Sequence, residues 1–145
     1  MLNIKLKKLS PTAKIPQKMS THAAGYDLYS CNEKEIILKR NEIKLISTGI
    51  AISIPPGYEA QIRPRSGLAV KNGIGVLNSP GTIDADYRGE IKVILFNFST
   101  KDFQIKPEMR IAQIIFSKHE AVNFTLTLEL DETDRGEGGF GHTST

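Results

Sequence analysis

The chain has 145 residues, of which 39% are hydrophobic and 24% charged, with a formal net charge of +3. These values indicate one globular domain and exclude a disordered, collagen-like or coiled-coil chain. A single cysteine, Cys31, excludes a disulfide framework and a cysteine-based zinc cluster, and no apolar run approaches the roughly 18 residues of a membrane span.

Short strands separated by turn residues dominate the predicted structure. Apolar and polar residues alternate with the period of two that strands require, and apolar runs rich in β-forming residues follow. In residues 90–98 both faces carry apolar side chains, so we expect both faces to be covered. The strand candidates are residues 2–6, 50–54, 90–98, 111–116 and 124–130.

One short helix is predicted between these strands, over residues 66–72. Ser66 is the expected N-cap and Gly73 the expected C-terminal stop. With so many short strands, the chain is predicted to be all-β, as a sandwich, a jelly roll or a barrel. Residues 135–145 are glycine-rich and polar, so we expect a domain over residues 1–134 followed by a mobile arm.

Five short stretches carry side chains suited to binding an anionic ligand or a metal. Arg65 and Ser66 stand where the predicted helix begins, which suits phosphate, although a surface turn is an equal alternative. Asp84 and Asp86 flank one residue, which suits a metal or a general base but also a polar hairpin. Asp27 is either a carboxylate beside a cation or the cap of a turn. The five stretches are residues 24–29, 63–69, 78–89, 110–116 and 135–145.

The last two of these stretches are weaker when each is taken alone. Gln113 lies within an apolar strand, where a polar group satisfied at a sheet edge is the simpler interpretation. In the tail, an aromatic residue between glycines can fold onto a planar ligand, with Arg and hydroxyl groups beside it for phosphate. A disordered chain end is the alternative.

Taken together, the five stretches resemble the five motifs of the trimeric deoxyuridine triphosphate nucleotidohydrolases, the dUTPases. The sequences AGYDL, PRSGLA, GTIDADYRG, RIAQ and RGEGGFG occur in the family's order and at similar spacings over nearly the whole chain. The resemblance implies an all-β, jelly-roll-like distorted barrel and a homotrimer with shared active sites. It also implies Mg²⁺-dependent hydrolysis of dUTP to dUMP and pyrophosphate, which limits uracil incorporation into DNA and supplies dUMP for dTMP synthesis.

The resemblance further implies roles for individual residues. Asp84 would orient the water that attacks the α-phosphorus, Tyr87 would lie under the deoxyribose, and Asp27 would hold hydrated Mg²⁺ through water. Phe140 would stack on uracil, while His142, which replaces a small hydroxyl residue of many family tails, is expected to change the affinity. The other implied substrate contacts come from the uracil-reading hairpin (Asn78, Gly81, Thr82 and Ile83), the phosphate-binding residues (Arg65, Ser66, Gly67 and Gln113), the tail (Arg135, Gly141, Thr143 and Ser144) and Lys92.

Two other functions stay open at this stage. A dCTP deaminase shares the fold, but it needs an acid or base at the cytosine ring, and the third stretch offers no additional Glu for it. A non-catalytic nucleotide-binding module would have lost the water-orienting carboxylate, whereas this chain keeps Asp84. We expect a cytoplasmic protein without a signal peptide or membrane contact. We also expect no stable nucleic-acid binding, because no stacking aromatics are interleaved with the basic residues.

Overall fold

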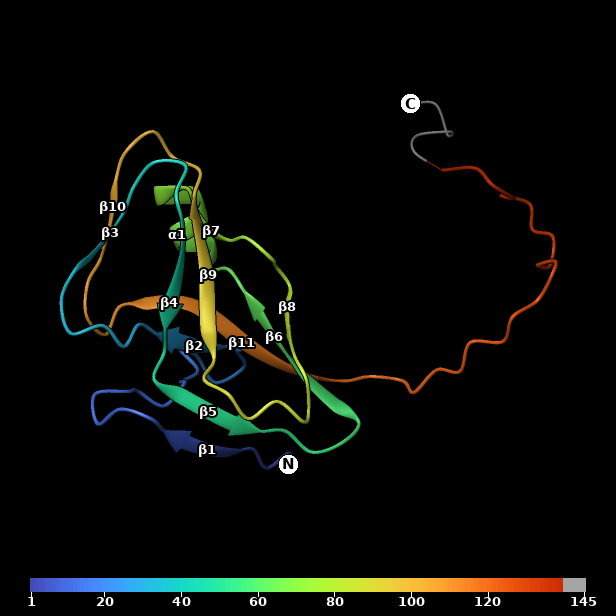
Figure 1. The fold of residues 1–145 in the computed structure, drawn as a ribbon, viewed down its shortest axis with the longest axis horizontal. Helices are drawn as coiled ribbons and strands as arrows, with labels where there is room; N and C mark the ends of the chain where they lie inside the picture. Colours follow the sequence, from blue (N-terminus) through green and yellow to red (C-terminus); the bar gives the residue numbers. More distant parts are fainter. Residues whose placement is uncertain (140–145) are drawn as a thin grey trace.

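The strands of this chain form four open sheets, accompanied by one short helix (Figure 1). A computed structural model describes residues 1–139. In this part the all-β prediction is confirmed, and no sheet closes into a barrel. The strands are β1 (Lys5–Lys8), β2 (Tyr26–Tyr29), β3 (Ile36–Leu38), β4 (Ile43–Ser47), β5 (Ile50–Ser53), β6 (Tyr58–Arg63), β7 (Ile74–Val76), β8 (Gly81–Ile83), β9 (Lys92–Asn97), β10 (Phe103–Ile105) and β11 (Arg110–Lys118).

The largest sheet has the antiparallel order β2-β11-β6-β8. In the middle of this sheet, Gln113 of β11 lies opposite Asp27 of β2 on one side and opposite Arg63 of β6 on the other. Strand β8 pairs with residues 60–62 of β6, on the side away from β11, and Ile83 lies opposite Ala60. Strand β6 therefore lies between the fourth motif on β11 and the third motif on β8, and it leads directly into the second motif at Arg63.

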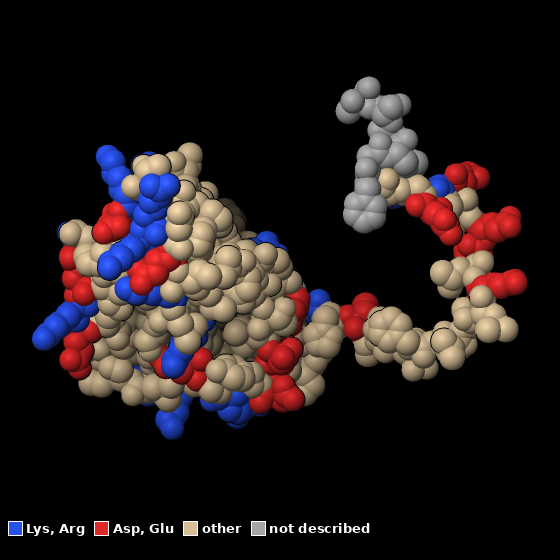
Figure 2. All heavy atoms as spheres, turned by 45° about the horizontal axis from the view of Figure 1, so that its top comes forward, with Lys and Arg blue, Asp and Glu red and all other residues tan. Residues whose placement is uncertain are grey.

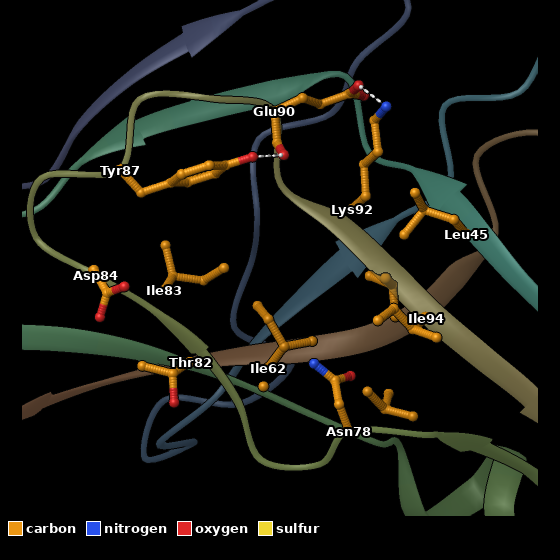
Figure 3. Close-up of a pocket in the computed structure, with 13 residues that line it drawn as sticks. Leu45, Ile62, Asn78, Thr82, Ile83, Asp84, Tyr87, Glu90, Lys92 and Ile94 are labelled. Atoms are coloured by element: carbon orange, nitrogen blue, oxygen red, sulfur yellow. Dashed lines mark hydrogen bonds and ion pairs between the residues drawn. The ribbon is translucent and has the colours of Figure 1, made fainter.

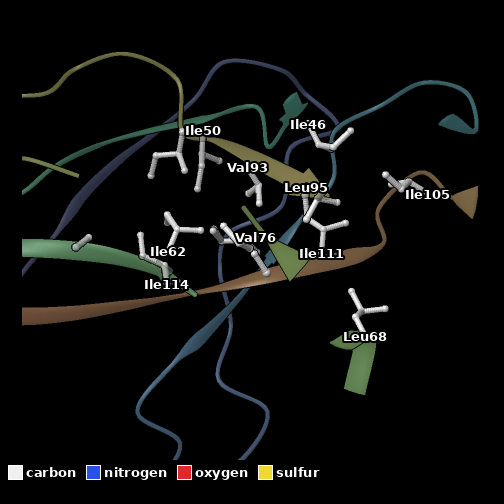
Figure 4. Packing of buried hydrophobic residues seen from close by; sticks show 14 of the residues in the cluster. Ile46, Ile50, Ile62, Leu68, Val76, Val93, Leu95, Ile105, Ile111 and Ile114 are labelled. Atoms are coloured by element: carbon white, nitrogen blue, oxygen red, sulfur yellow. The ribbon is translucent and has the colours of Figure 1, made fainter. Parts of the chain in front are cut away.

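The core lies where the sheet β4-β9-β7 packs on the largest sheet, and it is built almost entirely from aliphatic side chains (Figure 4). Val93 and Leu95 of β9 point into it and are at most 1% exposed. The other face of the same strand is only partly covered, because Ile94 and Phe96 are half-buried and Phe98, just beyond it, is 63% exposed. The expectation that both faces of this segment are covered is thus wrong for the single chain.

Helix α1 (Ser66–Asn72) has the predicted bounds but not the predicted N-terminal cap. Arg65 occupies the cap position without a side-chain cap hydrogen bond, and Ser66 is already helical. At the other end Gly73 has a φ of 64° and its N–H donates to the carbonyl of Ala69, as predicted for a helix stop. Leu68 is the one buried residue of the helix and ties it to the core. No helix within residues 1–139 is long and apolar enough to cross a membrane.

After β11 the chain leaves the body, and residues 119–139 contain neither a helix nor a strand (Figure 1). The strand predicted over residues 124–130 does not form, although its apolar residues alternate. Their side chains point into open space, with Leu126 99% and Leu128 102% exposed. A strand needs a partner for its backbone N–H and C=O groups, and within residues 1–139 no neighbouring strand pairs with this segment.

Candidate functional site

A pocket of about 290 Å³ opens beside the edge strand β8, the loop that follows it and strand β9 (Figure 3). Aliphatic side chains, among them Ile62 and Val93, form its floor, and polar side chains stand around its rim. An apolar cleft with a few convergent polar groups is the usual form of a small-molecule site. Seven residues singled out from the sequence line it: Asn78, Gly81, Thr82, Ile83, Asp84, Tyr87 and Lys92.

One wall of this pocket is an open strand edge. Strand β8 pairs with β6 on one side only, so the backbone of residues 81–83 has a second side free of strand pairing within the described chain. Gly81 permits a close approach here, because a Cβ atom would come within 3.0 Å of the Asn78 amide nitrogen. The wall therefore offers backbone donors and acceptors together with one side-chain amide.

Asp84 and Tyr87 occupy the two ends of the turn that follows β8. The Tyr87 N–H donates to the Asp84 carbonyl at 3.2 Å, so the chain reverses here instead of continuing as a strand. Asp84 is exposed on the rim of the pocket. The Tyr87 hydroxyl donates to the Glu90 carbonyl at 3.0 Å, which lays the ring along the pocket (Figure 3).

Glu90 joins this loop to the turn between β4 and β5. Its carboxylate accepts hydrogen bonds from the Ser47 hydroxyl and, at 2.8 Å, from the Gly49 N–H. Its other oxygen lies 3.5 Å from the Lys92 ammonium group. Burial by itself would raise the pKa of Glu90, but the hydrogen bonds from Ser47 and Gly49 and the charge of Lys92 outweigh burial and lower the pKa below its ordinary 4.5.

A second cluster lies where β2, β11 and the start of α1 meet. The Asp27 carboxylate is 13% exposed, and its Oδ2 lies 3.4 Å from Arg65 Nε and 3.2 Å from Arg110 Nη1. Arg65 also donates to the Arg110 carbonyl at 3.1 Å. One carboxylate thus holds two guanidinium groups side by side and keeps them oriented for an anion.

Gln113, Ser66 and Gly67 complete this second cluster. Gln113 donates to the Pro64 carbonyl at 3.0 Å and so connects β11 with the segment that leads into α1. Ser66 and Gly67 are exposed in the first turn of the helix. A Cβ atom at Gly67 would meet nothing within 4 Å, so nothing in the described chain requires a glycine there and space remains for a ligand.

The two clusters do not meet within one chain. Ile83, next to Asp84, lies opposite Ala60, whereas Arg65 follows five residues later along an extended backbone. At about 3.3 Å per residue, Arg65 stands about 16 Å from that point along the strand direction. The structure therefore groups the sequence-derived residues into two half-sites, which we call the pocket cluster and the arginine cluster.

The tail contributes to neither cluster in this structure. Arg135 lies in the extended segment, where its Nε donates to the Gly138 carbonyl at 2.7 Å. Phe140, Gly141, Thr143 and Ser144 lie outside the described residues.

Sequence reasoning missed several residues that shape these clusters. Arg110 belongs to the fourth stretch, but nothing in the pattern showed that it pairs with Asp27. Gly25 lets the Gln113 side chain approach the backbone closely, and Gly89 does the same for the Tyr87 ring, because a Cβ atom at either glycine would overlap that side chain. Glu90 directly follows the third stretch, and only its contacts in the fold reveal it. The glycines could have been found, since glycine inside a motif often marks a close approach.

The model of the dUTPase family matches residues 11–144. This chain belongs to the dUTPase family. It is 59% identical over 141 residues to the deoxyuridine 5'-triphosphate nucleotidohydrolase of Rickettsia akari, which covers 97% of this chain and 95% of the relative. The sequence resemblance to dUTPases is therefore confirmed, and it extends over almost the entire length of both proteins.

Solved dUTPase structures share the fold. The Staphylococcus bacteriophage 80alpha dUTPase with dUPNHPP matches with a TM-score of 0.89 and 25% identity, covering 99% of each chain. A mutant dUTPase from phage phi11 of S. aureus, described with a structural Mg(II) ion, matches with a TM-score of 0.81 and 22% identity over 90% of this chain and 99% of the other. Both likenesses confirm the expected dUTPase fold.

The lowered pKa of Glu90 predicts a specific pH dependence of stability. A carboxyl group whose pKa falls on folding stabilises the fold above its unfolded pKa, and that contribution is lost as the pH falls through the folded pKa. Glu90→Gln lacks it, so the difference in melting temperature between wild type and variant should be present at pH 7 and shrink below about pH 4.5. Thermal unfolding from pH 7 to pH 3 measures this. A constant difference across the range would contradict it, and Glu120→Gln in the exposed arm is the control.

Proposed function

We propose that this chain hydrolyses dUTP to dUMP and pyrophosphate, the activity named for its Rickettsia relatives. The observation that carries the proposal is the pocket cluster, in which Asp84 and Tyr87 stand on the rim of a cleft walled by an open strand edge. In the cell this activity would limit uracil incorporation into DNA and supply dUMP for dTMP synthesis.

The strand edge of β8 suits the recognition of uracil. Backbone N–H and C=O groups of residues 81–83 and the amide of Asn78 can pair with the edge of a pyrimidine, as an added strand would. A site built to hydrogen-bond one base leaves its polar groups unpaired with another base, which costs affinity. The backbone wall also leaves little space for a 5-methyl group. Tyr87 would lie under the deoxyribose and exclude a 2′-hydroxyl group, and Lys92 would add a further contact.

Asp84 would act as the base that orients and activates water. The water oxygen forms a bond to the α-phosphorus, the bond from that phosphorus to the bridging oxygen breaks, and pyrophosphate leaves. The carboxylate of Asp84 takes the proton of the water. An exposed carboxylate at the end of a short turn is well placed for this, since general bases must lie within hydrogen-bond reach of their proton.

The arginine cluster would bind the phosphates. Arg65 has a planar fork that suits phosphate oxygens, and Ser66, Gly67 and Gln113 lie beside it. Asp27 fits a hydrated Mg²⁺, because both guanidinium groups lie on its Oδ2 and within residues 1–139 its Oδ1 accepts no hydrogen bond. Mg²⁺ prefers oxygen ligands and keeps much of its water. When bound, it would neutralise charge on the substrate phosphates.

A homotrimer with shared sites would bring the two clusters together. If Asp84 acts at the α-phosphorus, phosphate-binding side chains must lie within a few ångströms of it, and the chain's own Arg65 lies about 16 Å away along the sheet. A neighbouring copy can supply the arginine cluster instead. The uncovered face of β4-β9-β7 borders the pocket and exposes Leu45 and Phe98 at 59% and 63%, which suits contact with another copy.

The extended arm supports the same assembly. Its apolar side chains recur at every second residue, as in a strand with one buried face, and each is at least 70% exposed in the single chain. We propose that this segment adds to a sheet edge of a neighbouring copy, and that residues 135–145 then close over that neighbour's site. There Arg135, Gly141, Thr143 and Ser144 would grip the phosphates and Phe140 would cover uracil. The apolar side chains that would pack on the neighbouring copy are Val122, Phe124, Leu126, Leu128 and Leu130.

The first test is pyrophosphate release from dUTP with Mg²⁺, measured beside dCTP, dTTP and UTP. We expect turnover of dUTP alone, because the pocket wall and Tyr87 would reject the others. Ammonia release from dCTP would instead identify a deaminase. Binding of dUTP without turnover of any nucleotide would identify a non-catalytic module.

Replacing the proposed base should separate binding from chemistry. Asp84→Asn keeps the shape of the side chain but not its basicity, so kcat for dUTP should fall roughly 10²–10⁴-fold while dUTP binding is retained. Single-turnover kinetics and calorimetric titration measure the two quantities. Asp86→Asn, an exposed carboxylate in the same turn, is the matched control and should stay near wild type. Similar losses in both variants would remove Asp84 from its role.

Mixing two inactive variants tests whether sites are shared. Asp84→Asn lacks the base and Arg65→Ala lacks a phosphate contact, so each alone should be nearly inactive. After the two are unfolded and refolded together, roughly a quarter of the sites should combine an intact Asp84 with a neighbour's intact Arg65 and regain activity. Gln113→Ala can replace Arg65→Ala if the latter fails to fold. A mixture no more active than its separate components would show that each chain carries its own complete site.

A further inference from the structure

The ring of Tyr87 is held by two contacts within its own loop. Its hydroxyl donates to the Glu90 carbonyl, so the ring spans the loop between these two residues. The ring also lies directly on Gly89, where a Cβ atom would overlap the hydroxyl, Cζ and Cε2 atoms of Tyr87. The orientation of the ring therefore depends on where the backbone at residues 89 and 90 stands.

The hydrogen bonds that tie this stretch of backbone to the body run through a single side chain. Within the described residues, the hydrogen bonds of residues 85–90 to another part of the sheet all end at the Glu90 carboxylate, which receives the Ser47 hydroxyl and the Gly49 N–H. The hydrogen bonds of Arg88 stay inside the loop, at the carbonyls of Ala85 and Tyr87. Strand pairing ends at Ile83 before the loop and resumes at Lys92, and just before that the Ile91 N–H donates to the Ile50 carbonyl.

The carboxylate is well suited to such an anchor. Its side chain is 21% exposed, so it is largely shielded from competing water, and both of its oxygens are engaged. One oxygen takes the two hydrogen bonds from the turn between β4 and β5, and the other lies beside the Lys92 ammonium group. Hydrogen bonds to an ionised acceptor are about twice as strong as neutral ones.

We propose that Glu90 is a positioning residue that sets the selection of deoxyribose over ribose, by fixing the Tyr87 ring through the Glu90 carbonyl before the nucleotide binds. The proposal rests on the function proposed above and assigns a cause to its sugar selectivity. Steric exclusion of a single hydroxyl group requires a wall that does not yield, because a ring displaced by an ångström would admit the ribose. The carboxylate supplies this rigidity without touching the sugar.

The experiment compares dUTP with UTP across a small set of variants. Glu90→Ala removes the carboxylate that anchors the loop, whereas Glu90→Gln keeps an oxygen that can accept hydrogen bonds from Ser47 and Gly49. Tyr87→Phe removes the hydroxyl that donates to the Glu90 carbonyl. The ratio of kcat/KM for dUTP over UTP is measured for each variant and for the double variant Glu90→Ala/Tyr87→Phe. The Kd ratio of UMP over dUMP, which falls when selectivity is lost, is measured by calorimetry as a readout that needs no turnover.

We expect Glu90→Ala to lower both ratios on the order of tenfold and Glu90→Gln to retain most of the selectivity. The double variant should lose little more selectivity for deoxyribose than either single variant loses, because the two residues act in one chain of contacts. Glu42→Ala is the matched control: this carboxylate also accepts from a backbone N–H, that of Lys39, and pairs with Lys44, but it lies on another turn. It should leave both ratios unchanged.

Equal losses of kcat/KM for dUTP and UTP in Glu90→Ala, with unchanged ratios, would overturn the proposal and leave Glu90 a merely structural role. Additive effects in the double variant would overturn it as well. If Glu90→Ala does not fold, Ser47→Ala removes one bond to the carboxylate and is judged by the same ratios. If the wild-type chain does not hydrolyse dUTP, the proposed function fails, while the Kd ratio of UMP over dUMP still decides the role of Glu90.

Discussion

The pairing of β6 with a different neighbour on each of its two sides governs the rest of the structure. Strand β11 pairs along the whole of β6 up to Arg63, next to the arginine cluster. On the other side, β8 pairs with residues 60–62, and its last residue, Ile83, lies opposite Ala60 and leads into the pocket cluster. Because an extended strand has a fixed rise per residue, this pairing separates the two half-sites by a distance that no side chain can span. The open face of the second sheet and the unpartnered arm are the features expected of a chain whose site is completed by other copies.

Each half-site is organised before a ligand arrives, and by opposite means. In the arginine cluster, a nearly buried carboxylate holds two guanidinium groups together that would otherwise repel each other. In the pocket cluster, the recognition groups belong to the backbone of an edge strand, and their positions follow from sheet geometry. Ion pairing thus orients the arginine cluster, which would bind phosphate, and sheet geometry orients the pocket cluster, which would bind a base.

The sequence predicted much of this fold because strands and turns leave local signals. The apolar run that became β9 and the glycine that ends α1 act through nearest neighbours, and both were found. Ser66 was misplaced as a cap because the helix start depends on the segment before it, where Arg65 is bound to Asp27 from a distant strand. The alternation in residues 124–130 is a genuine strand pattern, but pairing needs a partner that this chain does not provide within residues 1–139.

The site residues also divide into those with a local sequence signal and those recognised only from contacts in the fold. The motifs named most members of both clusters, since each motif lies on one continuous piece of chain. Their division into two half-sites follows from strand order, which the motifs do not contain. Arg110 and Glu90 escaped notice because their importance lies in contacts with residues far away in the sequence, Asp27 for one and Ser47 for the other.

The exposed arm also affects how readily unassembled chains aggregate. Figure 2 shows acidic side chains gathered along this segment, where residues 119–139 contain six Asp or Glu and one Arg. A row of alternating apolar side chains without a partner is the kind of segment that seeds aggregation when chains are crowded. Glu120 before the row and Glu129 within it make two such arms repel each other when they pair in register. In the proposed assembly this repulsion would keep newly synthesised chains apart until each arm meets the body of another copy, which carries most of the basic residues.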